Sequence, residues 1–134
     1  DKKLIENPTK KVKSKKSILI AGGWKPGCST DYDAVLLAKT YKAKEVINLS
    51  NIDYIYDSDP RQNPQAKKME NLTWTQLRQI VGDKWVPGAN LPFDPVAAKE
   101  AQKLKLTVKF VKGTDLSSLE NVLDNKSYQG SLIK

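Results

Sequence analysis

The sequence contains no histidine and only one cysteine among its 134 residues. Without histidine, the chain cannot build a Ser-His-Asp triad, a His-ligated zinc site or an imidazole proton relay. Carboxylates, lysines, hydroxyls and backbone amides are left to carry any chemistry, and a bound metal is expected to be a hard, oxygen-ligated ion such as Mg²⁺. Because Cys28 has no partner for an internal disulfide, a reducing compartment is expected.

Long apolar runs are also lacking. No run approaches the roughly 18 residues that a membrane span needs, and no signal segment opens the chain. We therefore expect a soluble, cytoplasmic protein with no membrane partner. The length suits one compact domain rather than two. The first residue is Asp rather than Met, which indicates a processed product or a fragment.

Arginine is scarce, although the chain is basic. Lys and Arg total 23 against 15 Asp and Glu, a formal net charge of +8, and only Arg61 and Arg78 are arginines. Much of the excess lies in a basic arm over residues 1–16, which we separate from a domain over residues 17–134. The arm lacks the arginines and aromatic residues that accompany lysines in nucleic-acid grooves, so a solvated surface segment is favoured and nucleic acid is not expected as a partner. Its lysines are Lys2, Lys3, Lys10, Lys11, Lys13, Lys15 and Lys16.

The first half of the domain predicts a strand-helix-strand unit. The apolar run S-I-L-I-A over residues 17–21 is typical of a buried strand in a parallel sheet. Thr30, with Asp33 three positions on, predicts the capping box of a helix that continues to about Tyr41. A second strand is predicted over residues 45–49. The polar stretch that follows, residues 50–70, predicts a long loop, with a short extended piece over residues 54–56.

The second half adds further helices and strands. Thr73 and Gln76 form a capping-box pattern at the start of a helix that ends near Gly82. Asp94 followed by Pro95 is a strong helix start. The whole order indicates an α/β protein with a mainly parallel sheet and helices on both faces. The other expected elements are an irregular stretch over residues 85–92, a strand over 106–111, a helix over 116–123 capped by Thr114 or Asp115, and a final edge strand over 131–133.

A glycine-rich segment, G-G-W-K-P-G-C-S-T-D-Y-D, follows the first predicted strand. Glycines allow a ligand to approach the backbone closely, and the free N–H groups of the following helix favour an anion, so a phosphate or carboxylate cradle is one interpretation. The other interpretation is a tight connection in which Gly22, Gly23 and Gly27 supply unusual dihedral angles. Of the three tryptophans, two are expected in the core, whereas Trp24 is the candidate for ligand contact. Cys28 has no neighbouring base and is treated as a loop residue.

A second polar segment, S-N-I-D-Y-I-Y-D-S-D-P, follows the second predicted strand. Its carboxylates and tyrosines could bind a magnesium-nucleotide, with Tyr54 and Tyr56 stacking on a base. Acidic loops are more often turns, and the D-S-D-P sequence around Asp57 and Asp59 has the composition of one. The residues alone leave both interpretations open.

Taken together, these segments resemble the uridylate kinases of the amino-acid kinase family, in their archaeal form. The resemblance rests on G-G-W-K-P-G-C-S-T-D-Y-D-A, on V-I-N-L-S-N-I-D-Y-I-Y-D-S-D-P-R-Q-N-P-Q-A-K-K, on P-F-D-P-V-A-A-K and on the closing G-S-L-I. It covers the chain from about residue 17 to the end and corresponds to the C-terminal part of the family's three-layer α/β fold. The chain departs from the family at Trp24, where a small polar residue is usual, and at Tyr54, where glycine is usual.

The resemblance implies ATP-dependent transfer of a phosphoryl group to UMP, giving UDP, with ATP and Mg²⁺ as cofactors. Asp31 would organise the phosphate-binding lysines of the family, and Asp94 would lie near the transferred phosphate. These two residues are the expected catalytic pair, and no residue is assigned as a metal ligand. The expected ATP contacts are Ser50, Tyr56 and Asp59, and the expected UMP contacts are Gly22, Gly23, Trp24, Lys25, Gly27, Ser29 and Thr30.

The resemblance also implies that the family's N-terminal part, with its phosphate-gripping loop, is absent from this sequence. We therefore expect weak nucleotide binding, no turnover by the chain alone, and self-association into a homo-oligomer through uncovered apolar surface. Three alternatives remain: a non-catalytic nucleotide- or anion-binding module of the same fold, a family member with another phosphate acceptor, and a basic protein associated with nucleic acid.

Overall fold

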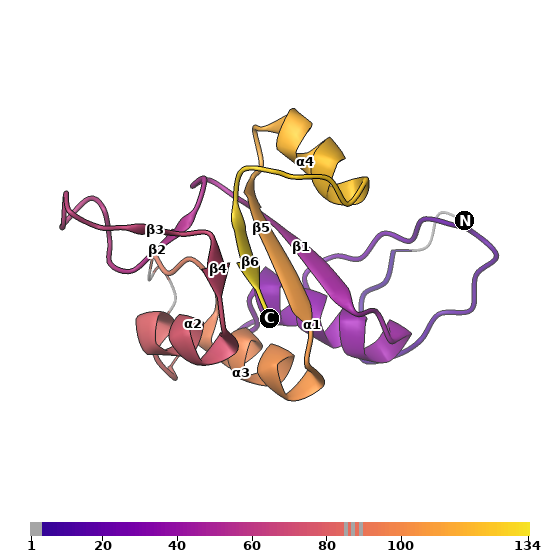
Figure 1. Ribbon diagram of the computed structural model, residues 1–134. Helices are drawn as coiled ribbons and strands as arrows, with labels where there is room; N and C mark the ends of the chain where they lie inside the picture. The colour runs from indigo at the N-terminus through magenta and orange to yellow at the C-terminus, as the bar shows by residue number, and fades with distance from the viewer. Residues whose placement is uncertain (1–3, 85, 87, 89) are drawn as a thin grey trace.

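The computed structural model describes residues 4–84, 86, 88 and 90–134 and contains a four-stranded sheet (Figure 1). The strands follow the order β1-β5-β6-β4. The pairs β1–β5 and β4–β6 are parallel and β5–β6 is antiparallel, so the expected mainly parallel sheet is confirmed. The strands are β1 (Glu45–Ser50), β4 (Asn71–Leu72), β5 (Thr107–Lys112) and β6 (Ser131–Ile133).

Within the described residues, four helices cover the two faces of this sheet. Helices α1, α2 and α3 lie on one side, where α3 contacts both of the others, and α4 lies on the opposite side against β5 (Figure 1). Helices on both faces of the sheet were predicted, and this architecture is confirmed. The helices are α1 (Thr30–Tyr41), α2 (Trp74–Val81), α3 (Pro95–Leu104) and α4 (Leu116–Leu123).

The segment between β1 and α2, predicted as a long loop, contains a short β-hairpin. Strands β2 (Ile55–Tyr56) and β3 (Lys68–Met69) pair antiparallel outside the main sheet. The extended piece predicted over residues 54–56 is therefore confirmed, whereas its partner strand was not predicted. Because β3 and β4 have two residues each, they carry no apolar alternation that a sequence pattern could detect.

Three of the four predicted helix starts are confirmed. Thr73 and Gln76 form a reciprocal capping box, in which the Thr73 hydroxyl accepts from the Gln76 N–H and the Gln76 side chain accepts from the Thr73 N–H. Asp94 caps α3, with Pro95 at its first position. Asp115, rather than Thr114, caps α4.

The predicted cap of α1 is wrong by one residue. Ser29 is the N-cap, and its hydroxyl oxygen accepts from the N–H of Tyr32. Thr30 is therefore the first residue of the helix, and Asp33 does not close a capping box. The Asp33 carboxylate instead accepts from the backbone N–H of Trp24, at 2.9 Å. Ser29 is the cap because its backbone is extended, which places its hydroxyl within reach of the Tyr32 N–H.

The strand predicted over residues 17–21 is also wrong. Within the described part of the chain this run forms only an isolated parallel bridge between Ala21 and Ile5. Ile18 and Ile20 are 81% and 68% exposed. An apolar run needs a neighbouring strand to satisfy its backbone groups, and none of the described strands lies along residues 17–20.

Strand β6 is an interior strand, which corrects the prediction of an edge strand over residues 131–133. It lies between β5 and β4, and its register pairs Ser131 with Phe110 and Ile133 with Val108. The short strand β4 supplies the missing neighbour. Because β4 was not recognised in the sequence, residues 131–133 had no second partner in the prediction.

The core lies between the sheet and the layer of α1, α2 and α3. Phe93 and Phe110 are its largest fully buried side chains. Trp74 is also buried, and its indole N–H donates to the carbonyl of Leu106 at 2.9 Å. This agrees with the expectation of core tryptophans, whereas Trp24 is half-buried. The stretch predicted as irregular, residues 85–92, falls partly on residues 85, 87 and 89, which lie outside the described residues, as does Trp85.

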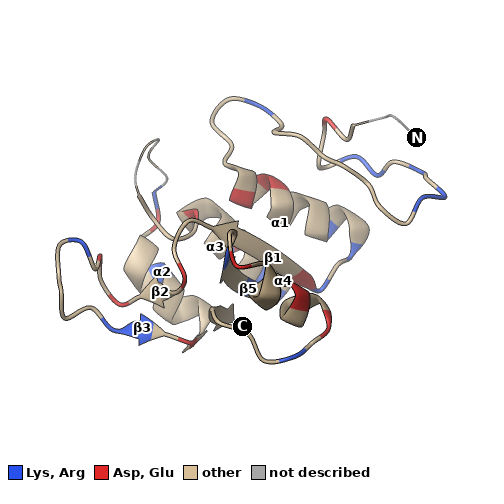
Figure 2. Cartoon of the chain, turned by 90° about the horizontal axis from the view of Figure 1, so that it is seen from above, with Lys and Arg blue, Asp and Glu red and all other residues tan. Residues whose placement is uncertain are grey.

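The described part of the basic arm folds back onto α1. Ile5 and Pro8 are buried, and the Thr40 hydroxyl donates to the Pro8 carbonyl at 2.6 Å. The N–H of Val12 donates to the hydroxyl of Tyr41 at 3.0 Å. The lysines of the arm that the structure describes lie along an exposed loop beside the C-terminal half of α1, whose N-terminal turn is acidic (Figure 2). They are Lys10, Lys11, Lys13, Lys15 and Lys16. None of the described helices is long and apolar enough to cross a membrane.

Candidate functional site

The N-termini of α1 and α3 are joined by reciprocal hydrogen bonds. From α1, the Asp31 carboxylate accepts from the backbone N–H of Asp94 at 2.9 Å. From α3, the Asp94 carboxylate accepts from the Ser29 hydroxyl at 2.5 Å, while its other oxygen caps α3 itself. The two helices therefore present their positive ends side by side. The N–H groups that begin α3 already donate to Asp31 and Asp94, so an anion is favoured here by the two helix dipoles and by the first turn of α1.

Strand β1 contributes to the same network through Asn48. Its side-chain amide donates to the second oxygen of Asp31 at 2.9 Å. Burial raises the pKa of the Asp31 carboxyl above its ordinary value, against the opposing hydrogen bonds from the Asp94 backbone and the Asn48 side chain. A partly buried carboxylate held from both sides has a fixed orientation, which is what a group that must position a ligand or a lysine requires.

The Asp31–Asp94 pair does not fit as a set of metal ligands. All four carboxylate oxygens accept hydrogen bonds from the chain itself. No group of three or more His, Cys, Asp or Glu side chains that could hold a metal occurs within the described ranges. Any Mg²⁺ bound here would need oxygen ligands in addition to these two carboxylates.

The glycine-rich segment leads into this network. Gly27 has a φ of +84°, a conformation that side chains disfavour, and the N–H of Cys28 donates to the Lys25 carbonyl in a tight turn. The Lys25 ammonium lies over the Trp24 ring, 4.1 Å from its centroid. This cation–π contact holds the Lys25 side chain against the tryptophan ring. Thr30 is exposed at the first turn of α1.

Two residues of this region were not recognised as functional candidates in the sequence. Asp33 is 5% exposed; one of its oxygens fastens Trp24 to α1, and the other has no hydrogen-bond partner among the described residues. Asn48 was predicted only as a residue of the strand over residues 45–49. The signal available for Asn48 was a polar amide inside the otherwise apolar run V-I-N-L.

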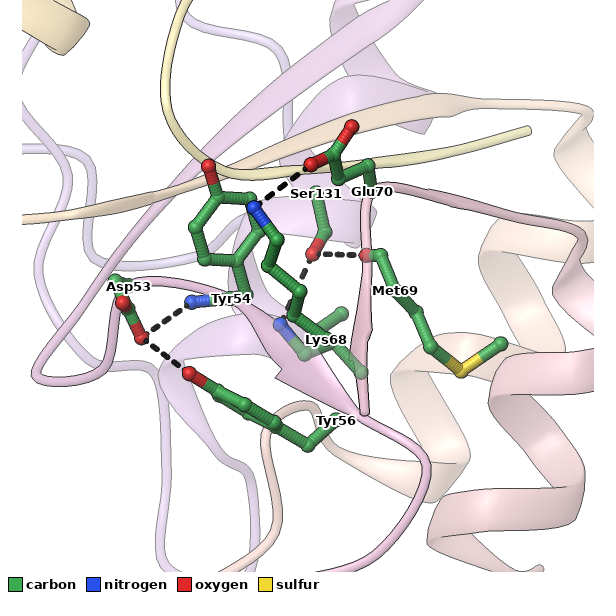
Figure 3. Close-up of polar contacts among 8 residues, drawn as sticks. Asp53, Tyr54, Tyr56, Lys68, Met69, Glu70 and Ser131 are labelled. Atoms are coloured by element: carbon green, nitrogen blue, oxygen red, sulfur yellow. Dashed lines mark hydrogen bonds and ion pairs between the residues drawn. The ribbon is translucent and has the colours of Figure 1, made fainter. Parts of the chain in front are cut away.

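The hairpin of β2 and β3 carries a second group of polar and aromatic side chains (Figure 3). The Tyr56 hydroxyl donates to the Asp53 carboxylate at 3.2 Å. Partial desolvation, followed by the negative charge of Asp53, raises the pKa of Tyr56. The Lys68 ammonium lies 4.7 Å from the centroid of the Tyr54 ring and pairs with Glu70 at 2.9 Å. Aromatic faces and charges of both signs thus lie together on one hairpin.

The acidic residues beyond Tyr56 stabilise the turn of this hairpin. The Asp57 carboxylate accepts from the Lys67 N–H at 2.9 Å. Asp59 binds the Arg61 guanidinium through both oxygens, at 3.0 and 2.9 Å, and these hydrogen bonds hold the pKa of Asp59 below its usual value. The geometry agrees with the turn interpretation, and a contact between Asp59 and ATP stays a prediction.

The predicted site residues therefore fall into two groups. Ser29, Asp31 and Asp94 lie in one hydrogen-bonded network, and Tyr56 lies on the hairpin. No hydrogen bond between described side chains joins the two. Strand β1 is related to both groups. It supplies Asn48 to the first, and it ends at Ser50, just before the hairpin, where the Ser50 carbonyl accepts from the Gly113 N–H at 2.7 Å.

Comparison with known proteins places this arrangement in a family. The model of the amino acid kinase family matches residues 1–112. The chain belongs to the amino acid kinase family. The resemblance found in the sequence is thereby confirmed at the level of the family, and the matched range begins before residue 17, where the resemblance was expected to start.

Several curated relatives of this chain are uridylate kinases. A uridylate kinase from Thermococcus onnurineus is 39% identical over 121 residues, which cover 89% of this chain and 53% of the relative. One from Methanospirillum hungatei is 35% identical over 117 residues, covering 87% of this chain and 50% of the relative. The crystal structure of a uridylate kinase from Archaeoglobus fulgidus matches with a TM-score of 0.73 at 32% identity, covering 87% of this chain and 51% of that one. The chain thus spans about half the length of these relatives.

Proposed function

We propose that this chain is the nucleotide-binding half of a uridylate kinase, which transfers a phosphoryl group from ATP to UMP and gives UDP. The proposal rests on one observation above the others: the paired N-termini of α1 and α3, linked through Asp31, Asp94 and Ser29, lie in a chain 39% identical to a uridylate kinase. Phosphoryl transfer depends mainly on positioning and charge neutralisation, and it needs no histidine.

UMP is proposed to bind where the glycine-rich segment meets α1. The exposed Thr30 and the free N–H groups of the first turn are suited to a monophosphate. Ser29 is less free, because its hydroxyl is already shared between Tyr32 and Asp94. Lys25 adds positive charge, and the Trp24 ring beneath it offers an apolar surface. Gly23 and Gly27 leave room for the ligand to approach the backbone, whereas the Leu4 side chain lies against Gly22.

ATP is proposed to bind beside the β2–β3 hairpin. Tyr56 offers an aromatic face for the base, and Ser50 and Asp59 offer polar groups for the sugar and the phosphates. Mg²⁺ would neutralise phosphate charge when it is bound with ATP. In this arrangement Asp31 and Asp94 hold the two helix ends in register and orient the cationic groups around the phosphates.

The chain alone is not proposed to turn over substrate, because it spans about half the length of its relatives. We expect it to bind nucleotides weakly and to self-associate. A cytoplasmic location is part of the same proposal.

The proposal is tested by titrating the chain separately with UMP and with ATP, each with Mg²⁺, in a calorimeter. Thr30→Val removes the hydroxyl proposed to meet the charged phosphate, and about a tenfold loss of UMP affinity is expected. Thr114→Val is the matched control, because Thr114 is also exposed beside a helix start but lies next to α4. An unchanged ATP affinity in Thr30→Val would show that the loss is local.

Other results would contradict the proposal. Binding of neither nucleotide at millimolar concentration would overturn it. Binding of ATP without UMP would favour another phosphate acceptor or a non-catalytic binding module. Measurable conversion of UMP to UDP by the chain alone would overturn the statement that it is inactive.

A further inference from the structure

Ser131 contacts both strands of the hairpin from the middle of the main sheet. Its hydroxyl accepts from the backbone N–H of Ile55 at 2.9 Å and donates to the backbone carbonyl of Met69 at 2.6 Å (Figure 3). Ile55 and Met69 face each other across the hairpin. One hydroxyl therefore joins a β2 residue to its partner in β3, and it ties both to β6.

The position of Ser131 in the fold is unusual for a polar residue. The residue is completely buried, as is Ile133 on the same face of β6. An apolar side chain would be expected at such a position, since a buried hydroxyl is tolerated only when its hydrogen bonds are made. Ser131 makes one as acceptor and one as donor, so its burial is compensated by the hairpin.

Gly130, the residue before Ser131, allows β6 to lie close to β5. A Cβ atom on Gly130 would lie 2.1 Å from the carbonyl oxygen of Phe110, which no side chain could tolerate. Glycine at this position lets β6 lie against β5. The G-S pair in the closing G-S-L-I segment therefore has two linked roles: close approach by the glycine and contact with the hairpin by the serine.

The hairpin depends on such an anchor. Its paired strands have two residues each, and so short a hairpin is not stable by itself. The hairpin is also anchored by apolar side chains, because Ile55 is fully buried and Met69 packs partly buried against the core. Burial of an apolar side chain stabilises the docked hairpin but is not directional. The two hydrogen bonds of Ser131 to opposite strands are directional and fix the orientation of the hairpin.

We propose that Ser131 is a positioning residue for the nucleoside triphosphate: it holds the hairpin in the orientation that presents Tyr56 to the base. This inference rests on the proposed function, since it assumes that the hairpin binds ATP. Ser131 does not touch the ligand. It acts through Ile55 and Met69, at sequence separations of 76 and 62 residues.

The test compares Ser131→Ala with Ser118→Ala. Ser118 is also buried, at 3%, and its hydroxyl accepts from the Gln129 N–H, but it belongs to α4 and makes no hydrogen bond to the hairpin among the described residues. ATP and UMP affinities are measured for each variant, together with hydrogen exchange at the Ile55 amide. Ser131→Ala is expected to weaken ATP about tenfold, to change UMP less than about twofold and to speed exchange at Ile55.

Ser118→Ala is expected to lower stability without changing the ratio of the two affinities. Ser131→Thr keeps the hydroxyl, so it should preserve that ratio even where the added methyl group lowers stability. The inference is overturned if Ser131→Ala leaves ATP affinity unchanged, or if ATP and UMP affinities fall together.

The two proposals fail in different ways. If the unsubstituted chain binds no ATP, the proposed function is overturned together with the nucleotide part of this inference. The positioning of the hairpin is then decided by hydrogen exchange alone. Unchanged exchange at Ile55 in Ser131→Ala would overturn it.

Discussion

Replacing Asp94 should cost more than the loss of one helix cap. Asp94→Ala removes the acceptor of the Val96 and Ala97 N–H groups, at 2.6 and 2.8 Å, which cap α3. Loss of an N-cap costs about 1 kcal/mol. The substitution also leaves the half-buried Ser29 hydroxyl without its acceptor, which costs about 1 to 2 kcal/mol more. The free energy of unfolding should therefore fall by about 2 to 3 kcal/mol.

Urea unfolding followed by circular dichroism measures this loss, with Asp115→Ala as the control. Asp115 caps α4, but its carboxylate binds only Ser117 and Ser118 of the same helix, so about 1 kcal/mol is expected. Asp94→Asn keeps an oxygen for the cap and should fall between the two alanine variants. If Asp94→Ala costs no more than Asp115→Ala, Asp94 does not join α3 to α1 energetically, and the argument for a locked pair of helix ends is refuted.

Three further predictions concern the acid pair, β6 and the exposed apolar run. Burial raises the pKa of Asp31, so the stability that this residue contributes is present below the ordinary value of 3.8 and is lost as the pH rises through the higher pKa of the folded state. A ¹³C titration of the Asp31 carboxyl should show a midpoint above 3.8. A midpoint at or below 3.8 would contradict this. Gly130→Ala should lower the free energy of unfolding by about 3 kcal/mol or more in thermal melts, because the new Cβ would meet the Phe110 carbonyl; a loss below about 1 kcal/mol would show that β6 can shift. Replacing Ile18 and Ile20 by Lys should reduce self-association in sedimentation velocity, and an unchanged distribution would mean that this run is not the contact.

Helix starts were predictable from the sequence because they are local. The capping box of Thr73 and Gln76 and the Asp94–Pro95 start each depend on groups within a few residues. The wrong cap predicted for α1 also has a local cause. Ser29 and Thr30 are adjacent candidates, and the extended backbone of Ser29 makes it the cap.

Strand pairing was less predictable because it depends on distant partners. The run over residues 17–21 has the composition of a strand but pairs with none of the described strands, and β6 is interior because of a two-residue neighbour. The candidate site shows the same limit. Asp31 and Asp94 were predicted through a family resemblance, whereas Asn48 and Ser131 make hydrogen bonds to residues far apart in the sequence, which no local pattern indicates.

The central claim is that the two polar regions hold an acceptor monophosphate beside a triphosphate. A compound in which adenosine and uridine are joined by a polyphosphate bridge tests this most directly, since it can occupy both regions only if they are adjacent. Calorimetry should show that it binds at least about tenfold more tightly than ATP, because the second contact becomes intramolecular. Binding no tighter than that of ATP would contradict the claim.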